Sequence, residues 1–266
     1  MFLKTKTTGL IFFFLLCVSS PAFCLNYYWV NGSGVWSDLS HWNTMPDGSG
    51  PIHLNIPTSM DDVYFMNNGG VGYTVTMDAA NTIVKCRNMD WSAAPAGCTL
   101  TGTGTRADIH GSVVLKAGMT FNFAGDIWFV IDMNVTNTIT SNGVHFPQSV
   151  NFTGNAGSWE MSDALFVENR ITHYHGKLKT NNYKLTIRNG YFSQINGSAT
   201  QSLDLGSSEM YVIDGDIQMP FDNNNMTVGT SHIKMGSGGT IYGGGYYNPT
   251  LRLFKVTFNT QYSDNF

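Results

Sequence analysis

Short stretches of alternating apolar and polar residues run through most of the chain, most clearly over residues 150–212. Within Tyr183–Arg188, apolar side chains at the first, third and fifth positions alternate with polar ones, so a strand here would have one apolar and one polar face. Each stretch is short and ends at Gly, Asn, Asp or Ser, as at Asn142-Gly143, Asn189-Gly190 and Asp214-Gly215. Gly adopts positive φ without strain, and Asn and Asp tolerate it. The pattern therefore predicts many short strands separated by tight turns.

The spacing of these strands distinguishes between two all-β architectures. The strands follow one another at irregular intervals, without a repeat of fixed length, and clear two-residue hairpins between matched strands are lacking. We therefore predict a right-handed parallel β-helix, a solenoid whose coils differ in length through their loops. The alternative is a β-sandwich or jelly roll, because short strands at these intervals also suit that fold.

Residues 1–24 have the features of a secretory signal peptide. Lys4 and Lys6 precede the mostly apolar segment Gly9–Val18, which is too short to cross a bilayer comfortably. Small residues allow cleavage after Ala22 or, less well, after Cys24. Lipid attachment at Cys24 is a rival interpretation, although a bulky Phe precedes it. No later apolar segment is long enough to span a membrane, so we expect a secreted protein, extracellular or associated with the cell surface.

The composition agrees with an extracellular protein and excludes a nucleic-acid partner. Only 12% of the residues are charged, whereas glycine alone numbers 29. The formal net charge is −4, and removal of a signal peptide with two Lys and no acidic residue makes it −6. The chain has no stripe of Lys and Arg of the kind that nucleic acid requires.

Cys86 and Cys98 are the cysteines that remain once the signal peptide is removed. In an oxidising compartment they could form a disulfide that closes a short loop around Asp90-Trp91. The alternative is two separate buried thiols, because spacing alone does not determine pairing.

Residues 25–66 differ from the rest of the chain and are predicted to cap the solenoid, whose coils occupy residues 67–266. The segment holds three of the six tryptophans, Trp29, Trp36 and Trp42, and three prolines. The first coil of a solenoid has no neighbour on one side, and large aromatic side chains cover such an open end well. The alternative role for these tryptophans is a sugar-stacking platform.

The same segment resembles the opening segment of secreted bacterial β-helix proteins of the pectin-lyase-like and autotransporter-passenger kind. The resemblance rests on four elements: Trp29–Asp38, His41–Asn43, Pro57 and Asp61–Val63. The family pattern has Gly at the position of Asn31 and Asn at that of His41. The resemblance implies a β-helix at the surface of Gram-negative bacteria, where this fold serves both adhesins and polysaccharide-cleaving enzymes.

Pairs of acidic residues are the candidates for polysaccharide cleavage. Lyases and hydrolases on β-helices need clustered carboxylates, often around Ca²⁺, with a basic residue nearby. The close pairs in this chain are scattered: Asp61-Asp62, Asp126 with Asp132, Glu160 with Asp163, and Asp214 with Asp216. Each has an ordinary role at a turn or strand end. We therefore assign no catalytic residue and no cofactor, and a polysaccharide lyase or glycoside hydrolase is the alternative function.

His173 and His175 are the sharpest candidates for metal binding. In a strand they would share one face, with Tyr174 on the other. Two ligands do not make a metal site, and no third His lies nearby in the sequence. We therefore assign no metal and treat a structural pair as the default interpretation.

The predicted function is that of a secreted or cell-surface structural protein, adhesin-like and without catalysis. Its partner would be an extracellular polysaccharide or a surface protein, contacted through one face of the β-helix. Candidates for glycan contact are Trp42 and the three tyrosines around a triple-glycine turn, Tyr242, Tyr246 and Tyr247. Because Leu251–Phe258 still has a strand pattern and only eight residues follow it, we expect the chain to be the N-terminal part of a longer protein.

Overall fold

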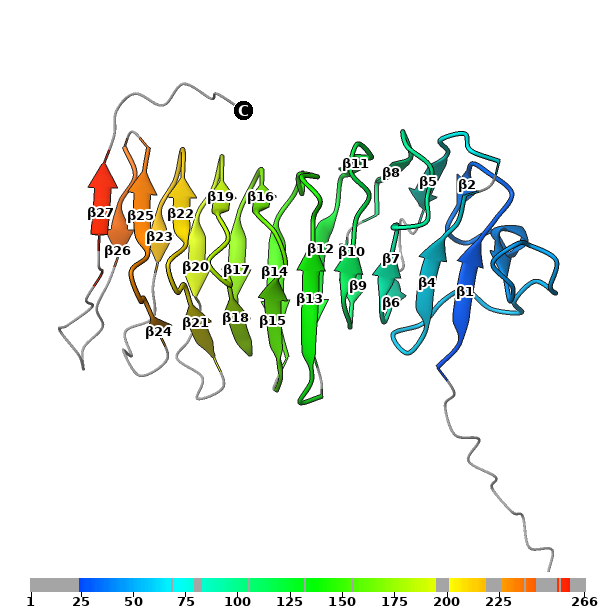
Figure 1. The fold of residues 1–266 in the computed structure, drawn as a ribbon, viewed down its shortest axis with the longest axis horizontal. Helices are drawn as coiled ribbons and strands as arrows, with labels where there is room; N and C mark the ends of the chain where they lie inside the picture. The colour runs from blue at the N-terminus through cyan, green and yellow to red at the C-terminus, as the bar shows by residue number, and fades with distance from the viewer. Residues whose placement is uncertain are drawn as a thin grey trace, which may run out of the picture.

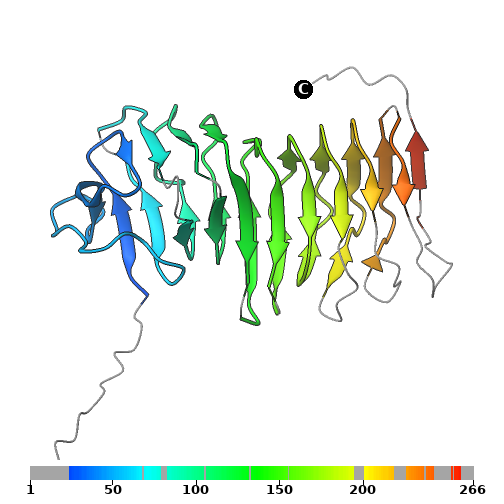
Figure 2. The ribbon, with the colours of Figure 1, turned by 180° about the vertical axis from the view of Figure 1, so that it is seen from behind.

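Successive coils of short strands stack along one axis in the computed structural model of this protein (Figures 1 and 2). The N-terminal strands, blue in Figure 1, lie at one end of the stack, and β27 (Lys255–Phe258) lies at the other. The arrangement confirms the predicted all-β solenoid. The structure describes residues 24–67, 69–78, 83–104, 106–131, 133–154, 156–194, 201–218, 226–236, 238–242, 253 and 255–258.

Four sheets form three walls of the solenoid. Sheet A contains β1 (Asn26–Trp29), β3 (Trp42–Asn43), β4 (Asp62–Phe65), β7 (Met89–Asp90), β10 (Val113–Val114), β13 (Thr136–Thr140), β15 (Ser158–Met161), β18 (Lys177–Lys179), β21 (Ser202–Asp204) and β24 (Met226–Thr227). Sheet C contains β6 (Val84–Cys86), β9 (Arg106–Ile109), β12 (Asp126–Val130), β14 (Val150–Thr153), β17 (Ile171–His173), β20 (Phe192–Gln194), β23 (Ile217–Gln218) and β26 (Ile241–Tyr242).

The third wall is divided between two sheets. Sheet B, in the N-terminal half, contains β2 (Gly34–Val35), β5 (Thr74–Met77), β8 (Thr99–Gly102) and β11 (Thr120–Phe123). Sheet D, in the C-terminal half, contains β16 (Leu165–Val167), β19 (Leu185–Ile187), β22 (Glu209–Val212), β25 (His232–Met235) and β27. In the intervening coil, this wall has an isolated bridge between Phe146 and Val167. The Phe146 ring also packs edge-on against Phe121 of β11, with centroids 5.3 Å apart.

Strands of successive coils pair parallel, and among the described strands only β1 and β3 pair antiparallel within a sheet. Parallel pairing excludes the sandwich alternative, whose sheets are antiparallel. The length of a coil varies: Glu160 pairs with Lys179, 19 residues later, whereas Val113 pairs with Ile139, 26 residues later. This variation explains why the sequence shows no repeat of fixed length.

The core lies between the three walls and is built from every second residue of the strands. On sheet C, Ile109, Phe129 and Phe152 follow one another in register and are all buried. The Phe129 and Phe152 rings stack with centroids 5.2 Å apart. Full burial of one such side chain stabilises the fold by roughly 1.5–3 kcal/mol, so the core is the main determinant of this architecture.

An aromatic cluster caps the N-terminal end, as predicted. Trp29, Trp36 and Trp42 are fully buried, and the Trp42 ring packs edge-on against both other indoles at centroid distances of 4.9 Å. The short 3₁₀ helix η1 (Leu39–His41) places Trp42 at the start of β3, which pairs antiparallel with β1 at the edge of sheet A. The edge of the first coil is thus covered by its own chain.

The predicted turns form, but for two different reasons. Asn142 and Gly143 both have positive φ, 49° and 76°, as expected. Gly190 and Gly215 do not adopt positive φ; they lie at stacked corners, where a Cβ on Gly215 would come within 1.5 Å of the Gly190 carbonyl oxygen. The predicted strand at Tyr183 begins two residues later at Leu185, because Tyr183 lies in the preceding turn.

The predicted signal peptide lies outside the described residues except for Cys24. Within the described part of the chain, no helix is long and apolar enough to cross a membrane.

Candidate functional site

A row of outward-facing residues crosses sheet C from end to end. These residues alternate along each strand with the buried residues of the core, and parallel pairing places them side by side on successive coils. We call this set the outer row; it consists of Lys85, Asp108, Trp128, Asn151, Thr172, Ser193, Gln218 and Tyr242. Neighbouring strands lie about 4.8 Å apart, so the outer row follows the long axis of the molecule. Four of its members, Asp108, Asn151, Thr172 and Ser193, are covered and only 1–4% exposed.

Three planar side chains stack on the N-terminal half of this face. The guanidinium carbon of Arg106 lies 4.5 Å from the centroid of the Trp128 ring. The Trp128 and Tyr174 rings stack with centroids 5.6 Å apart and an interplanar angle of 12°. Arg106 also donates two hydrogen bonds, of 2.7 and 2.8 Å, to the buried carboxylate of Asp108. Because Trp128 and Tyr174 are only half-buried, the stack presents rigid aromatic edges at the surface.

Two hydrogen-bond donors on the same face have no partner among the described residues. Asn151, only 1% exposed, follows Trp128 in the outer row, and its Nδ2 is unpaired. The Nε of Arg170 is also unpaired, although Nη1 of the same guanidinium donates to the Tyr191 hydroxyl at 2.9 Å. Buried donors in native proteins are nearly always satisfied by protein, water or ligand. Both donor atoms are covered in this structure, so they lie beneath the surface of the face and not on it.

The predicted glycan-binding residues have different locations. Tyr242 is 51% exposed and ends the outer row on β26. Tyr246 and Tyr247 lie outside the described residues. Trp42 is fully buried in the cap, where its Nε1 donates to the Trp36 carbonyl oxygen at 2.8 Å. A buried indole has no free face for a sugar, so Trp42 is not part of a binding surface.

His173 and His175 do not share a strand face. β17 ends at His173, which is fully buried and has Nε2 within 3.0 Å of the Gly176 carbonyl oxygen. Burial lowers the pKa of His173 to about 4, so its ring is neutral at neutral pH. His175 lies beyond the end of the strand and is partly exposed. Among the described residues, no three His, Cys, Asp or Glu side chains group as a metal site.

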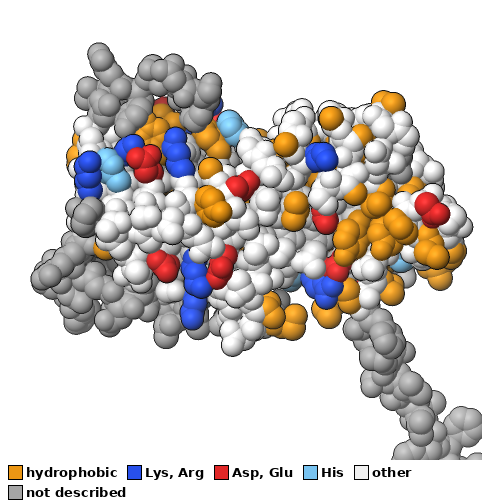
Figure 3. Space-filling model, viewed as in Figure 1, with side chains coloured by type: hydrophobic (Ala, Val, Ile, Leu, Met, Phe, Trp, Pro, Cys, Tyr) orange, Lys and Arg blue, Asp and Glu red, His pale blue; other side chains and the backbone are white. Residues whose placement is uncertain are grey.

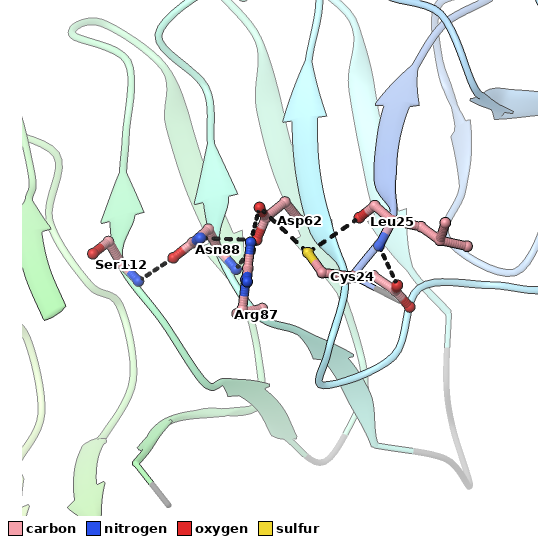
Figure 4. A network of polar contacts seen from close by, with 7 residues as sticks. Cys24, Leu25, Asp62, Arg87, Asn88 and Ser112 are labelled. Carbon is pink, nitrogen blue, oxygen red and sulfur yellow. Dashed lines mark hydrogen bonds and ion pairs between the residues drawn. The ribbon is translucent and has the colours of Figure 1, made fainter. Parts of the chain in front are cut away.

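The first acidic pair fastens the cap to the coils. Asp62, 4% exposed, accepts hydrogen bonds from Arg87 Nε at 2.7 Å and Asn88 Nδ2 at 2.8 Å (Figure 4). Asp61 accepts one from the backbone N–H of Leu25 at 3.1 Å. Both carboxylates are therefore engaged in linking strand β1 to the corners of the following coils, and they are not placed as an acid and base around a shared space.

The later acidic residues are engaged in the same structural way. Glu160 accepts a hydrogen bond from Lys179 at 2.6 Å, which lowers the pKa of the carboxyl group. Asp163 and Asp216 each accept a backbone N–H at 2.8 Å. Asp132 lies outside the described residues. The described carboxylates thus offer no cluster for polysaccharide cleavage.

Cys86 and Cys98 are free and buried. Cys86 lies in β6 of sheet C, whereas Cys98 precedes β8 of sheet B, so the two thiols belong to different walls and no disulfide joins them. Burial raises the pKa of both thiols, which makes them poor nucleophiles.

A small pocket of about 120 Å³ lies near the corner between sheets C and A. It is lined by Ser59, Met60, Arg87, His110, Ile131, Met133 and Val135. Its lining is mainly apolar, and the Arg87 guanidinium is already held by Asp62. The pocket therefore lacks the paired acid and base of a hydrolytic site.

No family model matches the chain, and no curated protein and no solved structure is significantly similar to it. The functional assignment therefore rests on the chemistry of the surface.

Trp128, Tyr174, Asn151 and Arg170 were not singled out from the sequence. Trp128 lies within the run Ile127–Val130, in which apolar residues occupy both faces, so the alternation that marks an outward residue is absent. Their proximity depends on the register between coils, which no repeat in the sequence indicates.

Proposed function

We propose that the protein is a non-catalytic, secreted or cell-surface binding protein that contacts glycans through the outer row of sheet C. The observation that carries the proposal is the stacked, half-buried Trp128–Tyr174 pair, with the Arg106 guanidinium over the Trp128 ring. Sugars present C–H faces and many hydroxyl oxygens. Aromatic side chains and amide or guanidinium donors are the groups that bind them.

The direction of the outer row favours an extended chain of sugars over a single sugar. Thr172, Ser193 and Gln218 continue the row beyond Asn151, and the half-exposed Tyr242 ends it. One coil advances by about 4.8 Å, close to the length of one pyranose unit. A polysaccharide aligned with the solenoid axis would therefore pass about one coil per sugar and contact accessible members of the row such as Trp128, Gln218 and Tyr242.

The N-terminal sequence supports a location outside the cytoplasm. Lys4 and Lys6 followed by Gly9–Val18 match the charged and apolar regions of a signal peptide. A binding protein for extracellular polysaccharide needs such export, so location and ligand are mutually consistent.

A glycan array probed with the full chain tests the proposal. Replacement of Trp128 by Ala should weaken binding at least tenfold, equivalent to about 1.4 kcal/mol, because it removes the centre of the aromatic stack. Tyr242→Ala should weaken binding of long chains more than that of short ones. The matched control is Tyr183→Ala, which removes an exposed aromatic ring outside sheet C and should leave binding unchanged.

The same samples should be assayed for new reducing or unsaturated sugar ends. Their formation would replace the binding function by the lyase or hydrolase alternative. Equal losses in Trp128→Ala and Tyr183→Ala would exclude the outer row as the glycan-contact surface.

A further inference from the structure

The outer face of sheet D concentrates positive charge on a chain whose net charge is −4. The group that we call the basic face consists of Lys184, Lys234, Lys255 and His232 around Glu209. Glu209, His232 and Lys255 stand opposite one another on β22, β25 and β27, and Lys234 lies two residues along β25. Figure 3 shows a group of charged side chains over the coils at the left, toward the C-terminal end: blue Lys or Arg, red Asp or Glu, and pale blue His.

The charges on this face do not cancel. Lys234 Nζ donates to Glu209 Oε1 at 2.6 Å, so the carboxylate of this group pairs directly with one of its lysines. Lys184 lies above the Tyr211 ring, with Nζ 5.4 Å from the centroid, and Lys255 is exposed. Among the residues named, three ammonium groups therefore surround one carboxylate, which gives this group of described residues a positive excess.

The titration of His232 reports the same excess. Its pKa is lowered, first by partial desolvation and then by the charges of Lys255 and Lys234. The pKa of the Glu209 carboxyl is also lowered, chiefly by the hydrogen bond from Lys234 and further by the positive charges of Lys234, His232 and Lys184. The positive charges that disfavour protonation of His232 would attract an anionic ligand.

Hydroxyl groups lie among the cations. The Nε2 of His232 is 2.8 Å from the Thr257 Oγ1, and Thr257 stands beside Lys234 across the strand pair. A ligand on this face thus meets ammonium groups separated by hydroxyl and imidazole groups, spread over strands about 4.8 Å apart. Such spacing suits an extended polymer with charges at intervals.

We propose that the basic face of sheet D binds an anionic polysaccharide, carboxylated or sulfated, aligned along the solenoid axis. The ammonium groups pair with the acidic groups of the polymer, while Thr257 and His232 contact its hydroxyls. Nucleic acid is the less suitable polyanion, since its dense phosphates demand more cations than this group of three lysines supplies. This site is separate from the outer row of sheet C and takes a different class of ligand.

Affinity electrophoresis of the full chain through gels containing dextran sulfate, alginate or neutral dextran tests this inference. Dextran sulfate, alginate or both should retard the protein, and this retardation should weaken as the salt concentration rises. Any retardation by neutral dextran should be the same in the wild-type chain and in the lysine variants. The double variant Lys234→Gln/Lys255→Gln should lose at least tenfold in affinity. Lys255→Gln alone should lower the affinity about threefold. Because this position is exposed, the single variant still tests the proposal if the double variant is unfolded.

The matched control is Lys177→Gln, which removes an exposed lysine from sheet A and should leave the retardation unchanged. NMR titration of His232 provides a second readout: its pKa should rise when dextran sulfate or alginate binds, because the polymer offsets the lysine charges. Equal losses in the Lys177 and Lys255 variants, an unchanged His232 pKa, or tighter binding of double-stranded DNA would each overturn the proposal.

Trp128→Ala separates this inference from the glycan site on sheet C. It should weaken array binding through the outer row at least tenfold and leave the retardation by dextran sulfate or alginate intact. Loss of both activities in this variant would overturn the separate basic site.

Discussion

Neighbouring residues on the strands of sheet C face two different environments. Inside, Phe129 and Phe152 stack on one another in a dry column. Trp128 and Asn151 occupy the adjacent positions of the same strands and point outward. Trp128 is half-buried, whereas Asn151 is covered and its Nδ2 has no partner among the described residues. The inner column is apolar from Ile109 to Phe152 and is followed by the buried His173, whereas the outer row mixes charged, polar and aromatic residues. The inner side therefore determines the fold, whereas the outer side is where coils of one architecture can differ in ligand.

The largest contrast should come from substituting adjacent residues on β14. Phe152→Ala removes a ring packed against Phe129, Trp159 and His173 and should lower the free energy of unfolding by about 3–5 kcal/mol. Asn151→Ala deletes an unsatisfied buried donor and should change it by less than about 1 kcal/mol. Urea denaturation measures both. Similar losses in the two variants would show that the outer row is as much a part of the core as the inner column.

The buried His173 interrupts the inner column and should make stability depend on pH. Its folded pKa of about 4 lies below the ordinary value of about 6.5. Above pH 6.5 the His173 ring is neutral in both the folded and the unfolded chain, and the folded state is at its most stable with respect to this group. As the pH falls below 6.5, the ring binds a proton in the unfolded chain but not in the folded one, which favours unfolding. This effect should lower the free energy of unfolding by about 3 kcal/mol by pH 4.

This pH effect is measured as the difference between the wild-type chain and His173→Phe, because other groups also titrate in this range. The variant should lose that part of the pH dependence, whereas His145→Gln, at a partly exposed position, should retain it. An unchanged pH profile in His173→Phe would mean that the ring is accessible to protons in the folded protein.

A smaller effect should reveal how rigid the outer row is. Arg106 holds the buried Asp108 carboxylate and covers Trp128, but its own side chain is 33% exposed. Arg106→Ala should therefore cost about 1–2 kcal/mol, less than the loss of a fully buried ion pair. Lys85→Ala, at the exposed start of the row, should stay within about 0.5 kcal/mol. Equal stabilities of these two variants would contradict a preorganised stack.

The smallest effect concerns the thiols of the interior. Because Cys86 and Cys98 are free and buried, dithiothreitol should not change the free energy of unfolding. A thiol reagent should modify them only after denaturant is added, as mass spectrometry of the modified chain would show. Destabilisation by the reductant would indicate a disulfide and a different path of the chain between β6 and β8.

The sequence carried the information for the interior more fully than that for the surface. Alternation at Leu185 and Ile187 and the three tryptophans of the cap predicted buried positions that the structure confirms, because burial leaves a periodic trace within a few residues. Trp128 and Tyr174 leave no such trace. They meet because the register of β12, β14 and β17 places them near one another across two coils, and this register depends on loops that alternation does not describe.

Local context also limited the prediction of individual residues. His173 and His175 have the spacing of residues on one strand face, but the strand ends between them and the first ring is taken into the core. Asn189-Gly190 and Asp214-Gly215 have the composition of positive-φ turns, yet Gly190 and Gly215 are required by the close approach of stacked corners. Such tertiary contacts cannot be inferred from two residues in isolation.

The change from sheet B to sheet D has a mechanical consequence. Two walls of the solenoid are continuous ladders of backbone hydrogen bonds, but among the described residues the third wall has only the isolated Phe146–Val167 bridge between β11 and β16. A stretching load applied along the axis is shared by three ladders elsewhere and chiefly by two at this seam. In a tethered molecule under flow, the first rupture should therefore occur there, separating an N-terminal block that carries the aromatic cap from a C-terminal block that carries the basic face.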